Sequence, residues 1–161
     1  IDGEKGILRY SIFPYSNSSL QDLAEEYATS LLNHFNYVGV LVIEFFVSKD
    51  GSLVANEMAP RVHNSGHWSI EGCSMSQFES HIRAITGQLT TFADAFKPSL
   101  MLNVLSKYPN REKISEIGKH YMHSYHKDER DLRKLGHITK VADHKEELLK
   151  DLERYLDILD N

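Results

Sequence analysis

The alternation of hydrophobic and polar residues predicts a β-hairpin in the first third of the chain. Residues 38–47 are mostly apolar, an Asp-Gly pair follows at 50–51, and residues 52–57 continue as a second strand. Asp-Gly between two apolar runs is a strong hairpin signal, because both central residues of a type I′ turn need positive φ angles. With these two residues as the loop, counting back along both strands places Glu44 directly opposite Glu57.

Two carboxylates that face each other across a strand pair repel, since directly opposed Cβ atoms lie about 4.5–5.5 Å apart. A divalent cation would offset this repulsion. Hard oxygen ligands without a thiol favour Mg²⁺ or Mn²⁺, and Mg²⁺ commonly takes one or two carboxylates together with phosphates and water. The alternative is a solvated sheet edge or a protonated carboxylate. Glu44 shares a strand face with Val40, Val42 and Phe46, which favours a metal site and phosphoryl chemistry.

Two amphipathic helices flank the hairpin in the sequence. The first has Ser18 or Ser19 as its N-cap and apolar residues at helical spacing from 20 to 35, so we expect it to pack on the hairpin. The second begins near Ser76, whose spacing to Glu79 is that of a capping box. Its expected buried face consists of Phe78, Ile82 and Ile85.

The pattern changes beyond residue 97. Three short strands are predicted at 100–105, 120–125 and 136–141, followed by an amphipathic terminal helix. We therefore predict an α+β chain, with residues 1–97 as one unit and residues 98–161 as a small β-rich domain closed by a helix. Residues 6–14 resemble a strand already under way without an initiating methionine, so we expect a fragment of a longer protein.

Composition narrows the class of protein. The 161 residues are 41% hydrophobic and carry a net charge of −5 with interspersed signs, which argues against general nucleic-acid binding. No apolar run approaches the ~20 residues that span a bilayer, and no signal-peptide pattern is present, so a cytoplasmic location is expected. The single cysteine, Cys73, excludes a disulfide framework and a thiolate-rich metal site within the chain.

A polar loop directly after the second hairpin strand is the next candidate for chemistry. Arg61 can bind an anion bidentately, and His63 or His67 can hold or exchange a proton near neutral pH. The structural alternative is a turn in which Asn64 and Ser65 satisfy their own backbone. The density of donors immediately after Glu57 favours a functional loop.

A charged segment at residues 127–137 contains four cations and three acids. Such a run is usually a solvated face, and its spacing alone favours that interpretation. The alternative is a phosphate-binding cluster of Lys127, Arg133 and Lys134, since these side chains donate charge-assisted hydrogen bonds to phosphate oxygens.

One long motif resembles a known family. The string Asn-Glu-Met-Ala-Pro-Arg-Val-His-Asn-Ser-Gly-His-Trp at 56–68, with Ser-Gln-Phe-Glu at 76–79, resembles the 5-(carboxyamino)imidazole ribonucleotide synthetases, the PurK-type ATP-grasp enzymes. Tyr-His-Lys at 125–127 and Arg-Lys-Leu-Gly-His at 133–137 resemble the C-terminal motif of that family. The resemblance covers nearly the whole chain in order. It implies the second ATP-grasp subdomain, an antiparallel sheet with helices, followed by the small C-terminal domain.

The resemblance also implies an activity and its metal. Members are ATP-dependent carbon–nitrogen ligases of purine biosynthesis that carboxylate 5-aminoimidazole ribonucleotide with bicarbonate and release ADP and phosphate. By position, Glu44 and Glu57 are implied as ligands of Mg²⁺ at the ATP phosphates, with Asn56 beside them. This role agrees with the carboxylate pair inferred from the hairpin.

The remaining site residues follow from the same resemblance. Arg61 and His63 are implied as catalytic residues, where bicarbonate is phosphorylated and the carboxyl group is transferred. The substrate-binding residues implied are Asn64, His67, Lys127, Arg133 and Lys134. The last three correspond to the site of the ribonucleotide 5′-phosphate.

The chain departs from the family in two ways. The family usually carries Pro-Gly where this chain has Asp131-Leu132, which predicts a different turn before Arg133. The family also has an N-terminal nucleotide-fold domain and a preceding ATP-grasp subdomain that supply the glycine-rich loop and the adenine contacts. We therefore expect no turnover by this chain alone. Family members are commonly dimers, so self-association as a homodimer is also expected. Alternatives are another ATP-grasp carboxylase or ligase, or a non-catalytic nucleotide-binding module.

Overall fold

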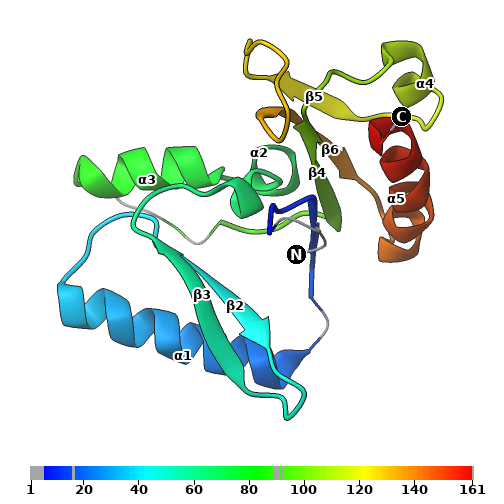
Figure 1. Ribbon diagram of the computed structural model, residues 1–161. Coiled ribbons are helices and arrows are strands. Elements are labelled where there is room, and N and C mark those ends of the chain that lie inside the picture. Colours follow the sequence, from blue (N-terminus) through cyan, green and yellow to red (C-terminus); the bar gives the residue numbers. More distant parts are fainter. Residues whose placement is uncertain (1–5, 16, 89–90, 92, 161) are drawn as a thin grey trace.

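The strands of the chain form two separate antiparallel units in a computed structural model that describes residues 6–15, 17–88, 91 and 93–160 (Figure 1). The strands are β1 (Tyr10–Phe13), β2 (Val42–Val47), β3 (Leu53–Ala59), β4 (Ser99–Leu105), β5 (Tyr121–Ser124) and β6 (Lys134–Val141). The helices are α1 (Ser18–Phe35), α2 (Ser69–Gly72), α3 (Gln77–Ile85), α4 (Arg111–Ser115) and α5 (Lys145–Asp160), with a 3-10 turn η1 (Asn64–Gly66). The predicted α+β class is confirmed.

The larger sheet has the strand order β1-β4-β6-β5, and its two faces differ in chemistry. Successive side chains of a strand point to opposite faces. Leu100, Leu102 and Val104 of β4 are fully buried in one apolar core with residues of α5, which closes this side as predicted. On the opposite face Asn103 pairs with His137 of β6, which in turn pairs with His123 of β5. A polar row therefore crosses a buried sheet.

Strand β1 belongs to this sheet although it lies early in the sequence. Tyr10 pairs with Leu102 and Phe13 with Ser99. The N-terminal segment thus contributes a strand to the same sheet as residues from the 98–161 range, and the division at residue 97 stays a prediction.

The hairpin of β2 and β3 pairs Glu44 with Glu57, as predicted, although its loop differs from the expected one. Ser48 pairs with Ser52 through a 2.9 Å bond, so the loop has three residues and ends at Gly51 with φ +83. A three-residue loop shifts the alignment of the strands by one residue. A bulge between Glu44 and Phe45 on the β2 side, which leaves Asn56 as the extra residue of β3, shifts it back.

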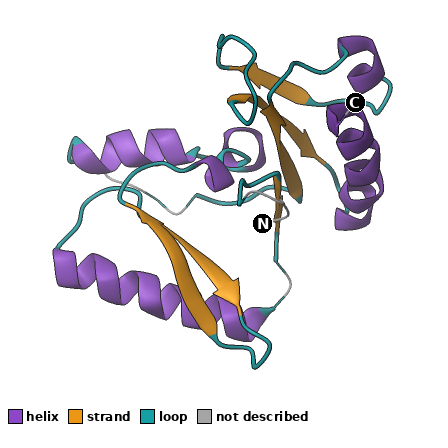
Figure 2. Cartoon of the chain, in the orientation of Figure 1, coloured by secondary structure: helices purple, strands orange, loops and turns teal. Residues whose placement is uncertain are grey.

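Helix α1 lies along the hairpin, where Tyr27 contacts Phe45 with ring centroids 6.0 Å apart (Figure 2). The expected N-cap at Ser18 or Ser19 is wrong. Asn17 caps the helix from an extended conformation, and its side chain accepts a hydrogen bond from the Leu20 amide. Asparagine is as good an N-cap as serine, so the earlier residue takes the position.

Helix α3 begins at the predicted cap, where the Ser76 hydroxyl accepts a hydrogen bond from the Glu79 amide. The expectation that its apolar face is buried is wrong. Phe78, Ile82 and Ile85 are 40%, 55% and 53% exposed. Helical spacing gathers these side chains on one face, where the His67 ring lies 5.4 Å from that of Phe78 but Ile82 and Ile85 stay about half exposed. No helix in the described ranges is both long enough and apolar enough to cross a membrane.

Candidate active site between the hairpin and the sheet

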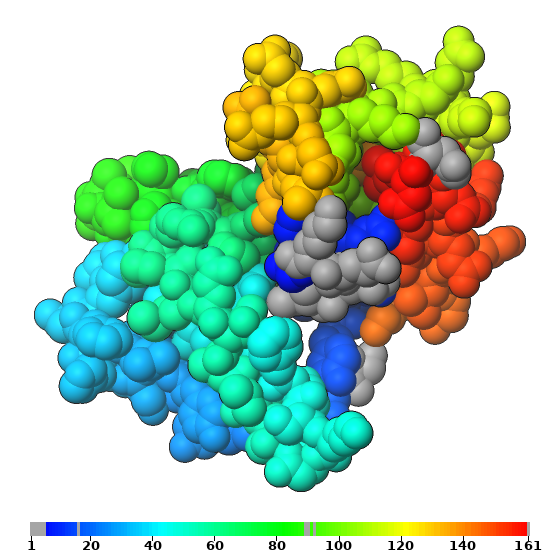
Figure 3. Space-filling view, viewed as in Figure 1, coloured from blue at the N-terminus to red at the C-terminus, as the bar shows by residue number. Residues whose placement is uncertain are grey.

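A cavity of about 390 Å³ joins the hairpin to the larger sheet. It is lined by Gly6, Ile7, Leu8, Glu44, Asn56, Glu57, His63, Leu132 and Lys134. Residues 6–8 and the segment that leads into β6 both line this cavity, and they lie side by side on the face shown in Figure 3. Segments far apart in the sequence therefore bring acids, an imidazole and one cation to a common space.

The hairpin bulge supplies the acidic side of the cavity. Glu44 and Glu57 are paired across the strands, and the Asn56 amide nitrogen lies 3.5 Å from a Glu44 carboxylate oxygen. The Glu44 side chain is 15% exposed, whereas that of Glu57 is 50% exposed. A bulge sets two residues of one strand against one of the other, which explains how Asn56 and Glu57 both lie opposite Glu44.

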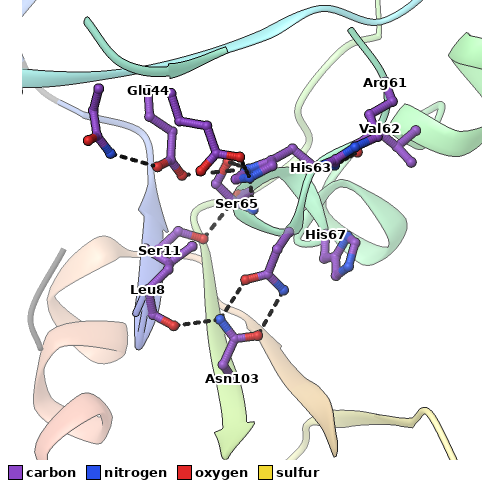
Figure 4. Close-up of polar contacts among 12 residues, drawn as sticks. Leu8, Ser11, Glu44, Arg61, Val62, His63, Ser65, His67 and Asn103 are labelled. Carbon is purple, nitrogen blue, oxygen red and sulfur yellow. Dashed lines mark hydrogen bonds and ion pairs between the residues drawn. The ribbon is translucent and has the colours of Figure 1, made fainter. Parts of the chain in front are cut away.

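His63 contacts both carboxylates of the opposed pair, and Figure 4 shows it beside Glu44. Its Nδ1 is 3.5 Å from Glu44 Oε1, and its Nε2 is 3.6 Å from Glu57 Oε1. The Ser65 hydroxyl lies 2.9 Å from Nδ1. One imidazole therefore lies within 3.6 Å of both carboxylates of the opposed pair.

The chemistry of these donors fits a magnesium ion. Glu44 and Glu57 offer hard carboxylate oxygens, and no thiol is among the residues that line the cavity. In the described part of the chain no group of three or more His, Cys, Asp or Glu side chains is arranged to hold a metal by itself. Mg²⁺ needs only one or two protein carboxylates when substrate phosphates supply its other ligands, so this set suits a metal that arrives with a nucleotide.

The loop that carries His63 is fastened to the sheet by side-chain amides. Asn64 and Asn103 donate to each other at 2.8 and 2.6 Å, and Asn103 also donates to the Leu8 carbonyl at 2.7 Å. The hydroxyl of Ser11 on β1 donates to the Ser65 carbonyl at 3.1 Å (Figure 4). The Asn64 side chain is therefore bonded to Asn103 of the sheet, whereas the structural alternative had it bonded to its own backbone.

His67 lies on the sheet side of the loop. Its Nδ1 is 2.9 Å from Gln77 Nε2, and its ring is 4.8 Å from the ring of His137. Burial lowers the pKa of His67 to about 4, with further contributions from His63, His123 and Lys134. His67 is consequently neutral at pH 7 and acts there as a hydrogen-bonding group, which leaves His63 as the loop histidine that lies beside acids.

The polar row of the sheet continues behind His67. His137 stacks on His123 with ring centroids 4.5 Å apart, and its Nδ1 lies 2.9 Å from the Tyr125 hydroxyl oxygen. Burial, together with His67 and His123, lowers the pKa of His137 to about 3. His123 Nε2 lies 2.6 Å from a carboxylate oxygen of Glu71. Sequence reasoning missed these residues, although polar side chains within buried strands were the available signal.

The other predicted site residues are spread around this cavity. Arg61 is exposed and donates to the carbonyl of Val62 at 2.8 Å, pointing away from the carboxylates (Figure 4). Lys134 lines the cavity, whereas Arg133 donates to the Asp128 carbonyl and Lys127 lies over the Tyr125 ring, 5.3 Å from its centroid. The expected three-residue phosphate cluster is thus represented inside the cavity by Lys134.

The turn before Arg133 contains Asp131 and Leu132, and the Arg133 amide donates to the Arg130 carbonyl across it. Leu132 has φ +58, in the left-handed region. Glycine adopts this region without steric cost, whereas a residue with a Cβ loses roughly 1–2 kcal/mol. Leu132 therefore occupies a backbone conformation that favours glycine.

Comparisons with known families agree with this arrangement of segments. The ATP-grasp domain family matches residues 2–78, and the phosphoribosylaminoimidazole carboxylase C-terminal domain family matches residues 99–151. The N5-carboxyaminoimidazole ribonucleotide synthase of Pseudomonas aeruginosa is 44% identical over 136 residues, which cover 84% of this chain and 37% of that protein.

Solved structures of this family are also similar to the chain over nearly its whole length. The synthetase of Thermus thermophilus is 39% identical with a TM-score of 0.91, over 99% of this chain and 45% of that one. The Aspergillus clavatus synthase, solved with ADP and 5-aminoimidazole ribonucleotide, is 32% identical with a TM-score of 0.88, over 99% of this chain and 45% of that one. The chain spans less than half the length of these relatives. It belongs to the N5-carboxyaminoimidazole ribonucleotide synthase family, as an ATP-grasp segment followed by the C-terminal domain.

Proposed function

We propose that this chain forms the C-terminal part of an ATP-dependent ligase that carboxylates 5-aminoimidazole ribonucleotide. A bicarbonate oxygen bonds to the γ-phosphorus of ATP as the bond to ADP breaks. The exocyclic amine nitrogen then bonds to the carboxyl carbon of the resulting carboxyphosphate, phosphate leaves, and the amine loses one proton. The cavity supports this assignment because it gathers Glu44, Glu57, His63 and Lys134.

The acidic side of the cavity suits the nucleotide phosphates. Glu44 and Glu57, with Asn56 beside them, would hold Mg²⁺, or Mn²⁺ in its place. When bound, the ion would neutralise charge that develops on the transferred phosphoryl group. The protein contribution is to hold the two carboxylates in register, which the strand pairing and the bulge support.

The histidine and arginine of the loop serve the bicarbonate half of the reaction in this proposal. His63 is buried and lies within 3.6 Å of both carboxylates, so it is a basic group available for the amine proton. Arg61 is exposed beside the loop, and its guanidinium is suited to a bicarbonate or carboxyphosphate anion once it turns inward.

The sheet side of the cavity suits the ribonucleotide. Lys134 places a cation inside the cavity. Lys127 and Arg133 belong to the segment that leads into β6, in keeping with a site for the 5′-phosphate. Asn64 is bonded to Asn103 of β4 and His67 contacts His137 of β6, so we assign the aminoimidazole ring to this side. The Aspergillus clavatus relative, solved with ADP and this ribonucleotide, makes the ligand class reasonable.

The remaining parts of the reaction need more protein than this chain. The glycine-rich loop and adenine contacts are assigned to an N-terminal half like that of the relatives, which are more than twice as long. We also propose a homodimer and a cytoplasmic location, as expected for the family.

Calorimetry with Mg²⁺·ADP tests the nucleotide site. The chain is titrated alone and after being joined to the N-terminal part of the Thermus thermophilus relative, with Glu44→Gln as the test variant. Glu26→Gln is the matched control, because Glu26 is exposed on α1 and undergoes the same change of charge. We expect binding in the joined protein, loss of binding with Glu44→Gln, and unchanged binding with Glu26→Gln.

The reaction itself is then assayed as ADP release that requires both bicarbonate and 5-aminoimidazole ribonucleotide. Release that depends on both substrates supports the proposal. Binding of nucleotide without such release, in a folded joined protein, would instead favour a non-catalytic nucleotide-binding module. Release with a different amine would favour another ATP-grasp ligase.

A further inference from the structure

Gln77, the first residue of α3, holds the loop that carries both site histidines. Its side chain is 9% exposed and lies among backbone groups of that loop. Gln77 Oε1 accepts a hydrogen bond from the His63 amide at 2.9 Å, and Gln77 Nε2 donates to the His63 carbonyl at 2.7 Å. This pair of bonds copies the pairing of two β-strand residues, so the loop is fixed to α3 at His63.

The two ends of the Gln77 amide cannot be exchanged. The His63 N–H requires an acceptor and the His63 carbonyl requires a donor, so oxygen must face the first and nitrogen the second. The nitrogen has a second proton, and it lies 2.9 Å from His67 Nδ1. His67 Nδ1 must therefore accept, and a neutral His67 then carries its proton on Nε2.

The loop is shaped to leave room for this amide. A Cβ atom on Gly66 would lie 2.7 Å from Gln77 Oε1, closer than real Cβ contacts come. The backbone nitrogen of Gln77 in turn receives support from α2, where the Ser69 hydroxyl lies 3.0 Å away. Glycine in the Asn-Ser-Gly-His segment is thus explained by the glutamine rather than by its own φ angle.

We propose that Gln77 is a positioning residue of the site, which sets the tautomer of His67 so that Nε2–H is presented as a neutral donor to the aminoimidazole ribonucleotide. The inference rests on the proposed function for its ligand. His67 is half-buried, and none of the described residues hydrogen-bonds its Nε2. The ring lies between His63, next to the carboxylates, and Tyr125 of the sheet side, whose ring centroid is 6.4 Å away.

A neutral donor suits this place because the surroundings are already basic. His63, His123, His137 and Lys134 face His67 from the loop, β5 and β6. A positive charge on His67 would be repelled by that of Lys134. A neutral N–H can bind an acceptor on the ribonucleotide without that cost. Fixing the tautomer in advance also avoids a reorganisation when the substrate arrives.

Gln77→Glu tests the assignment with almost no change of shape. The glutamate can still accept from the His63 amide, but it has no proton to give to the His63 carbonyl or to His67 Nδ1. Gln88→Glu is the matched control, since Gln88 is exposed just beyond α3 and undergoes the same change of charge.

The first readout is the protonation of the His67 ring nitrogens, measured by ¹H–¹⁵N correlation on the histidine-labelled chain at pH 7.5. We expect unprotonated Nδ1 and protonated Nε2 in the wild type and in Gln88→Glu. In Gln77→Glu the proton moves to Nδ1, or His67 becomes cationic. A wild type with protonated Nδ1 would overturn the proposal, even if the variant failed to fold.

The second readout is kinetic and uses the chain joined to the N-terminal part of the Thermus thermophilus relative. We expect Gln77→Glu to lower kcat/KM for the ribonucleotide by roughly 10²-fold, as for other misplaced site groups, with an unchanged KM for ATP. In a His67→Gln background the same substitution should have little further effect. Equal losses in both backgrounds, or a raised KM for ATP, would overturn the positioning role.

The two readouts separate the two proposals. If the joined protein carboxylates no ribonucleotide while His67 shows the expected tautomer, the proposed function fails and the hydrogen-bond assignment stands. If carboxylation is observed and the tautomer is the opposite one, the role of Gln77 fails and the proposed function stands.

Discussion

Replacing Asn103 with leucine should destabilise the chain by more than the small change in side-chain volume would explain. Asn103 is 3% exposed in the middle of β4 and makes three side-chain hydrogen bonds, two with Asn64 and one to the Leu8 carbonyl. Leucine has a similar size but no polar atoms. Asn103→Leu therefore leaves the Leu8 carbonyl and both ends of the Asn64 amide without these partners.

The magnitude follows from the number of bonds. Each buried hydrogen bond contributes about 0.5–1.5 kcal/mol net, so three bonds amount to about 3 kcal/mol. Asn64 is half-buried, and water can compensate part of its loss. The leucine gains contact with apolar neighbours, which offsets a further part. We expect the free energy of unfolding to fall by about 2–3 kcal/mol.

Urea unfolding followed by circular dichroism measures this loss, with an unchanged m value as the sign that the native structure is retained. Asn33→Leu is the matched control, because Asn33 is exposed on α1 and its side chain makes no hydrogen bond among those described. A double-mutant cycle with Asn64→Ala isolates the amide pair, for which coupling of about 1–3 kcal/mol is expected. A loss below about 1 kcal/mol, or additivity of Asn64→Ala and Asn103→Leu, would refute this account of the loop.

Three further predictions concern stability. Leu132→Gly should raise the free energy of unfolding by about 1 kcal/mol in urea, because Leu132 has φ +58; a loss would show that its side chain matters more than its backbone. His67 and His137 have pKa values of about 4 and about 3, below the unfolded value near 6.5, so the unfolded chain binds more protons. Stability from these two is full above pH 6.5 and should fall by about 2.5 kcal/mol from pH 7 to 5.5, measured as urea midpoints; a flat profile contradicts it. Tyr155→Phe should leave the thermal midpoint unchanged or higher, since the buried hydroxyl meets no partner in the described residues, and a drop would reveal one.

The hairpin shows how much of a strand pairing the local sequence pattern can predict. The pairing of Glu44 with Glu57 was predicted correctly from a two-residue loop, although the real loop has three residues. The bulge at Asn56 adds one residue to β3 and restores the same pairing. Strand alternation could not reveal this bulge, because β3 is exposed along most of its length and its pattern does not mark an inner face.

The helices show a second limit. Helical spacing predicted α3 and its apolar face correctly in kind, yet Ile82 and Ile85 remain about half exposed. Periodicity identifies which side chains share a face, whereas burial depends on which other element packs against that face. That element cannot be inferred from the helix itself.

The residues of the candidate site also differ in whether a local sequence pattern could predict them. Glu44, Glu57 and His63 could be predicted because they lie within one hairpin and the motif that follows it. Gln77 and Asn103 could not be assigned, since their roles depend on contacts with a loop 14 and 39 residues away in sequence. A polar residue in the apolar run of β4 indicated a partner, but only the sheet register identifies it.

The site is consequently held by two different supports. His67 and the backbone of His63 are bonded to α3 and, through Asn64, to a sheet whose other face packs under α5. The two carboxylates belong to a hairpin whose described residues contribute few buried side chains. The His63 imidazole lies between these supports, within 3.6 Å of each carboxylate. A shift of the hairpin against the sheet would therefore move Glu44 and Glu57 relative to His63, while Gln77 kept His67 in place. The geometry of the proposed phosphoryl-transfer half thus depends on the hairpin, and that of the ribonucleotide half depends on the sheet.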